Sequence, residues 1–132
     1  MTGGIKTSRI LIVDDEAHIR LLLEQALENL EEKGVELLMA PNGEEALRII
    51  EAEKPELVFL DVMMPKMNGL DVCNAVKNKL KMKDVFIVML TAKGQEIEKV
   101  QGREAGADLY MTKPFDPDEV YEKAVEILKL GD

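Results

Sequence analysis

The feature that most constrains the fold is a regular alternation of short apolar runs with amphipathic stretches, from one end of the chain to the other. The apolar runs predict strands at residues 9–13, 35–40, 57–60, 85–90 and 108–111. The runs at 57–60 and 85–90 contain only apolar residues, without alternation. This pattern is typical of parallel strands that are covered on both faces.

The stretches between the runs carry apolar residues at helical spacing and predict helices. They lie at residues 16–33, 43–53, 70–80, 94–105 and 116–130. Gly34 ends the first predicted helix, and Pro117 lies near the start of the last, where its missing N–H costs nothing. Gly94 and Gly102 make the fourth helix the weakest, because glycine lowers helix propensity. We therefore expect that helix to be the most mobile segment.

Successive β-then-α units without a linker predict one α/β domain over residues 9–130, after a flexible N-terminal lead over residues 1–8. Right-handed crossovers make its mainly parallel sheet doubly wound, with helices on both faces. Such sheets bind ligands outside the carboxyl ends of their strands. The residues at those ends therefore decide the function.

Charge and cysteine content exclude several classes of function. The chain has 17 basic and 26 acidic side chains and a net charge of −9, which disfavours direct binding to nucleic acid or to an anionic membrane. Neither a run of about 18 apolar residues nor a signal-peptide pattern is present, so we expect a cytoplasmic protein. Cys73, the single cysteine, cannot form an intramolecular disulfide and is expected to be a small buried apolar residue.

The ends of the predicted strands carry carboxylates, a hydroxyl and an ammonium. Asp14 and Asp15 follow the first strand, Asp61 the third, Thr91 the fourth and Lys113 the fifth. We expect them to converge, because these strand ends share one edge of the sheet. Simpler roles stay open for each: a helix N-cap for either N-terminal aspartate, a turn for the threonine, and a solvated surface position for the lysine.

Electrostatics indicates that these acids need a cation. Two carboxylates ~4 Å apart repel each other by about 4 kcal/mol at an effective dielectric constant of 20. Either one of them holds a proton with a raised pKa, or a cation is present. Lys113 supplies one positive charge for three acids. Mg²⁺ suits a site with few carboxylates, waters and a phosphate, and no Cys/His cluster favours a softer metal.

Four motifs together resemble one known family. The chain from Arg9 to Leu130 resembles the receiver domain of two-component response regulators, the chemotaxis-regulator-like fold. The resemblance implies a flavodoxin-like, five-stranded parallel sheet in the order 2-1-3-4-5. The motifs that carry it are ILIVDDE (10–16), LVFLDVMMPKMNG (57–69), VMLTAK (88–93) and AGADLYMTKPF (105–115).

The resemblance implies a phosphoacceptor rather than a turnover enzyme. Asp61 would accept a phosphoryl group from a phosphohistidine of a histidine kinase or a histidine phosphotransfer protein, and the domain would catalyse only its own phosphorylation and dephosphorylation. Lys113 would pair with the phosphoryl oxygens, and the bond from Lys113 to Pro114 would be cis. The implied Mg²⁺ ligands are Asp14, Asp15, Asp61 and the backbone carbonyl of Met63.

The resemblance also implies a conformational switch. Thr91 would hydrogen-bond the phosphoryl group, and Tyr110 would turn inward to change an output face formed by helix four, strand five and helix five. That face would control a downstream protein partner. An ordinary tyrosine at the edge of the surface is the alternative for Tyr110. The expected docking residues for the phosphodonor are His18, Ile19, Leu21, Pro114 and Phe115.

Two further residues suggest how long the phosphoryl group lasts. Met63 has no hydrogen-bonding side chain, and Lys93 is cationic rather than acidic or amide-bearing. Both positions depart from what the faster-dephosphorylating members of the family that this chain resembles show there, so we expect slow loss of the phosphoryl group. Pro65 and Gly69 would shape the loop after Asp61, Gly69 through a backbone conformation closed to larger residues.

Several alternatives remain. A Mg²⁺-dependent phosphohydrolase of the aspartyl-phosphate type would have a second acid two residues after the nucleophile, where this chain has Met63. A flavodoxin-like electron carrier would need a Ser/Thr/Gly-rich loop in place of DDEAH. A degenerate receiver would lack key residues that are present here. The chain could be a stand-alone regulator, which the acidic ending favours, or the receiver part of a longer regulator with an output domain.

Overall fold

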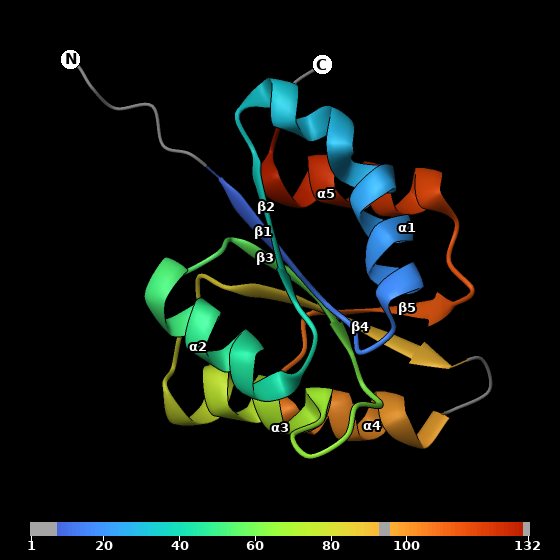
Figure 1. Ribbon diagram of the computed structural model, residues 1–132. Helices are drawn as coiled ribbons and strands as arrows, with labels where there is room; N and C mark the ends of the chain where they lie inside the picture. The colour runs from blue at the N-terminus through green and yellow to red at the C-terminus, as the bar shows by residue number, and fades with distance from the viewer. Residues whose placement is uncertain (1–7, 93–95, 131–132) are drawn as a thin grey trace.

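The computed structural model describes residues 8–92 and 96–130, without the side chains of residues 96–99 and 102. They form a parallel sheet in the order β2-β1-β3-β4-β5, with α1 and α5 on one face and α2, α3 and α4 on the other (Figure 1). The predicted doubly wound fold and strand order are therefore confirmed. The strands are β1 (Arg9–Val13), β2 (Glu36–Ala40), β3 (Leu57–Asp61), β4 (Phe86–Ala92) and β5 (Leu109–Lys113). The helices are α1 (Ala17–Leu27), α2 (Gly43–Glu53), α3 (Gly69–Asn74), α4 (Glu96–Ala105) and α5 (Pro117–Leu128).

The sheet separates two apolar cores because successive side chains of a strand point to opposite faces. Leu11 and Val13 of β1 belong to the core under α2 and α3, while Ile10 and Ile12 belong to the core under α1 and α5. All residues of β3 are buried, Asp61 included. The apolar runs without alternation are thus explained by burial on both faces, as predicted.

Three strands continue further than their apolar runs predicted. In the parallel register, Asp61 of β3 lies opposite Leu90, Thr91 of β4 lies opposite Thr112, and Lys113 of β5 lies opposite Ala92. Asp61, Thr91 and Lys113 are therefore the last or nearly last residues of strands rather than members of loops. Their backbones are held by the sheet.

Two of the predicted helices change geometry along their length. After α1, a 3-10 segment η1 (Glu28–Lys33) runs to Gly34, whose left-handed φ of 87° ends the helix as predicted. After α3, a π-helical segment η2 (Ala75–Lys79) completes the predicted helix. Asn42, Asn68 and Asp116 cap α2, α3 and α5 with their side chains. Gly94 and most of the N-terminal lead lie outside the described residues, so the expectations about their mobility stay predictions.

Gly69 is required for a different reason from the one that the sequence suggested. Its φ does not lie in the left-handed region; the residue lies against the carbonyl group of Asp61 and the Cα of Val62. A Cβ at this position would overlap the Asp61 carbonyl. Gly69 therefore allows the start of α3 to pack directly on the strand end that carries Asp61.

We predict that Gly69→Ala lowers the free energy of unfolding by about 2–3 kcal/mol, because the added methyl group would push the α3 backbone away from Asp61. Gly34→Ala is the matched control: its φ is left-handed but a Cβ there meets open space, so the cost should be about 1 kcal/mol. Urea unfolding followed by circular dichroism measures both. Equal losses for the two variants would contradict the packing explanation.

Candidate functional site

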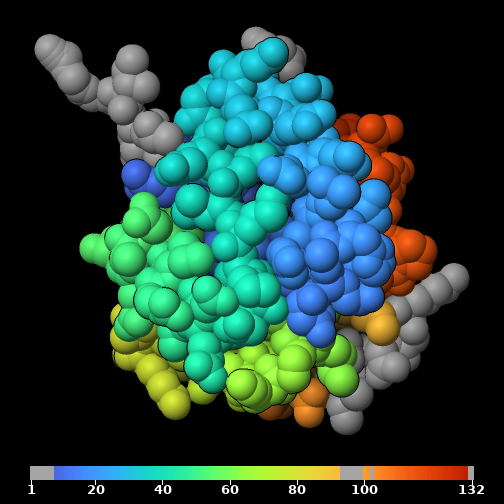
Figure 2. Space-filling model, in the orientation of Figure 1, coloured from blue at the N-terminus to red at the C-terminus, as the bar shows by residue number. Residues whose placement is uncertain are grey.

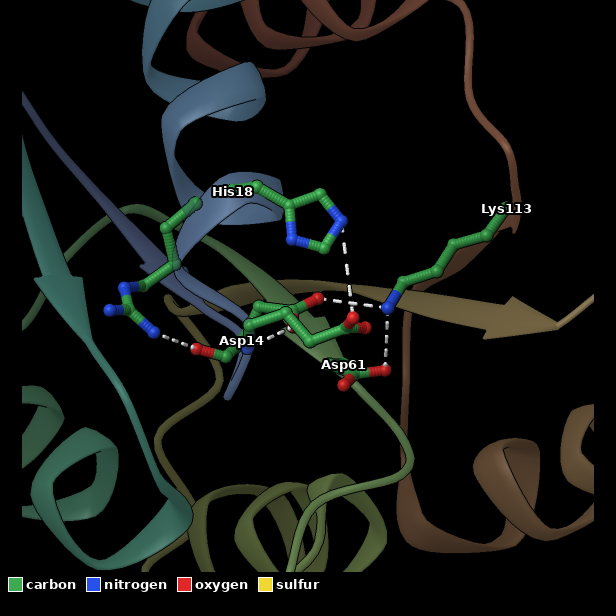
Figure 3. Close-up of polar contacts among 6 residues, drawn as sticks. Asp14, His18, Asp61 and Lys113 are labelled. Atoms are coloured by element: carbon green, nitrogen blue, oxygen red, sulfur yellow. Dashed lines mark hydrogen bonds and ion pairs between the residues drawn. The ribbon is translucent and has the colours of Figure 1, made fainter.

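The candidate site lies at the carboxyl ends of β1, β3 and β5. The Nζ atom of Lys113 donates to Asp14 Oδ2 at 2.8 Å and to Asp61 Oδ1 at 3.1 Å (Figure 3). These residues are separated by 99 and 52 positions in the sequence. The predicted convergence of the two carboxylates and the ammonium is present in the structure.

Asp14 is held at several atoms. It is completely buried, and its Oδ1 accepts a hydrogen bond from the backbone N–H of Glu16 at 2.9 Å. Its backbone carbonyl accepts a hydrogen bond from Arg20 Nη1 at 2.7 Å. The N-cap of α1 is Glu16, without a side-chain capping bond, so neither Asp14 nor Asp15 fills the N-cap position that the sequence left open.

Asp15 and Glu16 extend the acidic cluster toward solvent. Both are exposed, and carboxylate oxygens of Asp14, Asp15 and Glu16 all lie within 4.8 Å of one another. The sequence analysis did not include Glu16 among the site residues, although it directly follows the aspartate pair. Oxygen ligands at this spacing fit a hard divalent cation such as Mg²⁺.

Burial strongly affects the protonation of Asp61. The residue is 4 % exposed, and burial together with the nearby charge of Asp14 raises the pKa of Asp61 to about 6. The charge and hydrogen bond of Lys113 lower it, but not enough to restore the ordinary value of 3.8. For Lys113, burial lowers the pKa, but hydrogen bonds and charges of Asp14 and Asp61 outweigh that effect, so its pKa is raised and it stays protonated. One ammonium therefore compensates the buried carboxylates only in part.

Two buried hydroxyl groups of β4 and β5 have no hydrogen-bond partner among the described residues. They belong to Thr91, which is 1 % exposed, and to Tyr110. Tyr110 lies in β5 and packs against the core under α2 and α3, where burial raises its pKa. Its hydroxyl is thus already enclosed, which argues against an ordinary surface tyrosine. Buried hydroxyls without a partner are uncommon and call for an explanation.

The loops around the site agree with several expectations. The peptide bond from Lys113 to Pro114 is cis. Met63 has a side chain that is mostly exposed, and its backbone N–H lowers the pKa of Asp61 as a hydrogen-bond donor. The role of the Met63 backbone carbonyl as a metal ligand stays a prediction. Lys93 lies outside the described residues.

The residues expected to contact a phosphodonor divide into exposed and partly buried ones. Leu21 is 51 % exposed and Leu22 is also exposed, whereas Ile19 and Phe115 pack partly against the core. His18 is exposed, with its Nε2 3.9 Å from Glu16 Oε2 (Figure 3). The space-filling view shows α1 at the surface next to η1 (Figure 2).

A large hollow of the protein lies away from this cluster. It has a volume of about 940 Å³ and lies near the amino ends of the strands, where Arg9, Lys54 and Lys83 are among its lining residues. None of the carboxylate cluster lines it. The helices of the described residues also include none with the length and apolar character that a membrane span requires.

Comparison with known proteins identifies the family. The family described as "response regulator receiver domain" matches residues 10–125. The transcriptional regulatory protein PhoP for alkaline phosphatase synthesis, from Bacillus subtilis, is 49 % identical over 122 residues, which cover 92 % of this chain and 48 % of PhoP. The phosphate regulon regulator PhoB of Pseudomonas aeruginosa is 44 % identical over 91 % of this chain and 51 % of its own length. The chain thus spans about half the length of these relatives.

Solved structures show the same fold. A response regulator from Chloroflexus aurantiacus has a TM-score of 0.81 at 37 % identity, covering 94 % of this chain and 99 % of that chain. The BeF₃-activated receiver domain of DrrB has a TM-score of 0.81 at 28 % identity, with the same coverage. The chemotaxis protein CheY4 of Vibrio cholerae has a TM-score of 0.77 at 30 % identity, covering 92 % of this chain and 98 % of that chain.

The curated relatives are named as transcriptional regulators, so they lend no support to the expectation that nucleic acid is not a direct partner. The family match over most of the chain, the strand order and the clustered acids all indicate the same family. This chain belongs to the response regulator receiver domain family of two-component signalling proteins.

Proposed function

We propose that this domain accepts a phosphoryl group on Asp61 from the phosphohistidine of a histidine kinase or a histidine phosphotransfer protein. The observation that carries the proposal is the position of Lys113 Nζ, within hydrogen-bond distance of both Asp14 and Asp61. In the transfer, a carboxylate oxygen of Asp61 would form a bond to phosphorus while the phosphorus–nitrogen bond to the donor histidine breaks. This reaction mainly requires positioning and charge neutralisation, which fits a rigid strand end beside an ammonium.

The cofactor that we propose is Mg²⁺, held by Asp14, Asp15, Asp61 and the backbone carbonyl of Met63. The chemistry of the site supports it: the side-chain ligands are oxygens, and those of Asp14 and Asp15 lie within 4.8 Å of each other. Asp61 shares the Lys113 ammonium with Asp14, and its pKa is raised because burial and the Asp14 charge disfavour its ionised form. When bound, Mg²⁺ would neutralise carboxylate charge and bind phosphoryl oxygens. The alternative phosphohydrolase would have an acid at position 63, where this chain has a methionine.

We assign the first contacts of the phosphoryl group to Lys113 and Thr91. The Lys113 ammonium would pair with a phosphoryl oxygen in place of one of its present carboxylate partners. The Thr91 hydroxyl would donate to another oxygen, and this would give a partner to a buried group that lacks one among the described residues. The phosphoryl group thus favours the conformer in which Thr91 faces it, and a ligand that favours one conformer shifts the population.

Tyr110 would transmit this change to an output face made of α4, β5 and α5. Tyr110 lies in β5 opposite Met89 of β4, next to the strand end that carries Thr91. Its hydroxyl is already enclosed here without a described partner, so in this proposal the side chain also has a second, more exposed position from which it would turn inward. The switch role stays a proposal for both residues.

The relatives' names make transcription the best candidate for the final output. PhoP and PhoB are transcriptional regulators, and this chain matches about half of each. We propose that the phosphorylated domain controls a partner or a further domain that acts on transcription. The net charge of −9 supports contact with protein rather than with DNA for the receiver domain itself.

The proposal predicts that incubation with acetyl phosphate and Mg²⁺ adds one phosphoryl group to the wild-type protein. Asp61→Asn should add none, since the amide cannot act as the acceptor, and EDTA should suppress the reaction of the wild type. Intact-mass spectrometry measures the product. The control is Asp84→Asn, which removes an exposed acid outside the cluster and should leave phosphorylation unchanged. Phosphorylation of Asp61→Asn to the wild-type extent would refute the assignment.

A second prediction concerns stability and pH. The pKa of Asp61 is higher in the folded protein than its ordinary 3.8, so the folded state loses stability relative to the unfolded state as the pH rises from about 4 through about 6. In EDTA at pH 8, Asp61→Asn should therefore be more stable than the wild type by about 2–3 kcal/mol, and the difference should largely disappear at pH 4.

Urea unfolding at both pH values measures this effect, with Asp84→Asn as the control for loss of one negative charge. Adding Mg²⁺ at pH 8 should stabilise the wild type more than Asp61→Asn. A wild type that is as stable as Asp61→Asn at pH 8 in EDTA would show that the Asp61 charge is fully compensated without a cation.

A third prediction concerns the lifetime of the phosphoryl group. The Met63 side chain is 67 % exposed beside Asp61 and cannot orient water by hydrogen bonding. Met63→Asn should speed the loss of phosphate by about tenfold, equivalent to ~1.4 kcal/mol of barrier, whereas Met63→Leu should leave it unchanged. Phosphate release from pre-phosphorylated protein in Mg²⁺ measures the rate. Equal rates for the asparagine and leucine variants would remove Met63 from the explanation.

A further inference from the structure

Arg20 contacts the acidic cluster in an unusual way. It lies in α1, six residues after Asp14, and its Nη1 donates to the Asp14 backbone carbonyl at 2.7 Å. Within residues 8–92 and 96–130, Arg20 makes no ion pair, although Asp14, Asp15 and Glu16 are close in the sequence. The guanidinium therefore binds a carbonyl oxygen and none of the carboxylate oxygens of the cluster.

The hydrogen bond from Arg20 to the Asp14 carbonyl lies at the end of β1, where the turn that carries Asp14, Asp15 and Glu16 begins. The ladder with β2 ends with Val13 opposite Ala40, and the Asp14 N–H still reaches the Ala40 carbonyl at 3.3 Å. The Asp14 carbonyl accepts its hydrogen bond from the Arg20 side chain rather than from the backbone of a neighbouring strand. Arg20 also donates its own backbone N–H to the Glu16 carbonyl at 3.1 Å. That second bond is the ordinary helical bond of the backbone, so the contribution specific to the Arg20 side chain is its hold on the Asp14 carbonyl.

Asp14 is consequently fixed on three sides. Arg20 holds its carbonyl, the Glu16 N–H holds Oδ1, and Lys113 holds Oδ2. The peptide unit that joins Asp14 to Asp15 includes that carbonyl, so its orientation determines where the Asp15 carboxylate points relative to the Asp14 carboxylate. Releasing the carbonyl would allow this peptide to rotate and separate the two carboxylates.

We propose that Arg20 is a positioning residue for the cation site, which orients the peptide between Asp14 and Asp15 so that both carboxylates face one Mg²⁺. The inference rests on the proposed magnesium-dependent function and adds a residue to it. Arg20 does not touch the ion or the phosphoryl group; it acts through the backbone of Asp14. Groups that orient metal ligands commonly change metal affinity when they are replaced.

Electrostatics alone makes the opposite prediction, and this makes the proposal testable. A positive charge near the cluster repels Mg²⁺, so a neutral residue at position 20 would strengthen binding if charge were its only contribution. Arg20→Lys keeps the charge and a donor that can reach a carbonyl, whereas Arg20→Met loses both. Positioning predicts tighter Mg²⁺ binding by the lysine variant than by the methionine variant, and charge alone predicts the reverse.

The experiment is a Mg²⁺ titration of ¹⁵N-labelled, EDTA-stripped protein, followed by the amide shifts of Asp15 and Glu16. Circular dichroism first establishes a temperature at which every variant is fully folded, so that a loss of stability does not enter the result. Arg48→Met removes an exposed positive charge on α2 and is the control for net charge. We expect Arg20→Met to weaken Mg²⁺ binding by about 10-fold and Arg20→Lys to restore most of it.

Each outcome separates the two proposals. Mg²⁺ binding by Arg20→Met that is as tight as in the wild type, or tighter, overturns the role of Arg20 and leaves the proposed function intact. Equal weakening in Arg20→Lys and Arg20→Met also overturns it, because a donor of the same charge then fails to substitute. A wild type without Mg²⁺-dependent shifts overturns the proposed magnesium site and the role of Arg20 together.

Discussion

The site depends on one interaction, the bridge that Lys113 makes between Asp14 and Asp61. Burying carboxylates without compensation is costly, and two of them side by side also repel each other. The ammonium, 2.8 Å and 3.1 Å from their oxygens, makes the arrangement possible. It does not complete the compensation, because the pKa of Asp61 remains raised to about 6. In the proposed function, this residual negative charge attracts a cation, and the cation together with Lys113 would bind the phosphoryl oxygens.

The rigidity of the sheet sets the geometry of that bridge. Asp61 and Lys113 are the final residues of β3 and β5, and Thr91 lies in β4 between them, so none relies on a flexible loop for its position. Gly69 lets the backbone of α3 pack directly against Asp61, and Arg20 ties α1 to the end of β1. The sheet and both layers of helices thus fix the backbone at the strand ends that carry Asp14 and Asp61.

Much of this arrangement could be predicted from the sequence, because apolar periodicity and parallel topology place all strand ends on one edge. The strand order came from a resemblance to a family, and the structure confirms it. Other features were not predictable, since they depend on tertiary contacts. Strand pairing extends β4 through Thr91, and close packing rather than a left-handed φ requires Gly69. The contact of Arg20 with a backbone carbonyl leaves no pattern in the sequence.

The most direct test of this account is the pKa of the Asp61 carboxyl group, measured by ¹³C NMR in EDTA and again at saturating Mg²⁺. The account predicts a value of about 6 without metal, and a clear decrease when Mg²⁺ binds, because a cation favours the ionised form. A value near the ordinary 3.8 in EDTA, unchanged by Mg²⁺, would contradict it. Lys113 would then compensate the buried acids by itself, and the site would have no need of a cation.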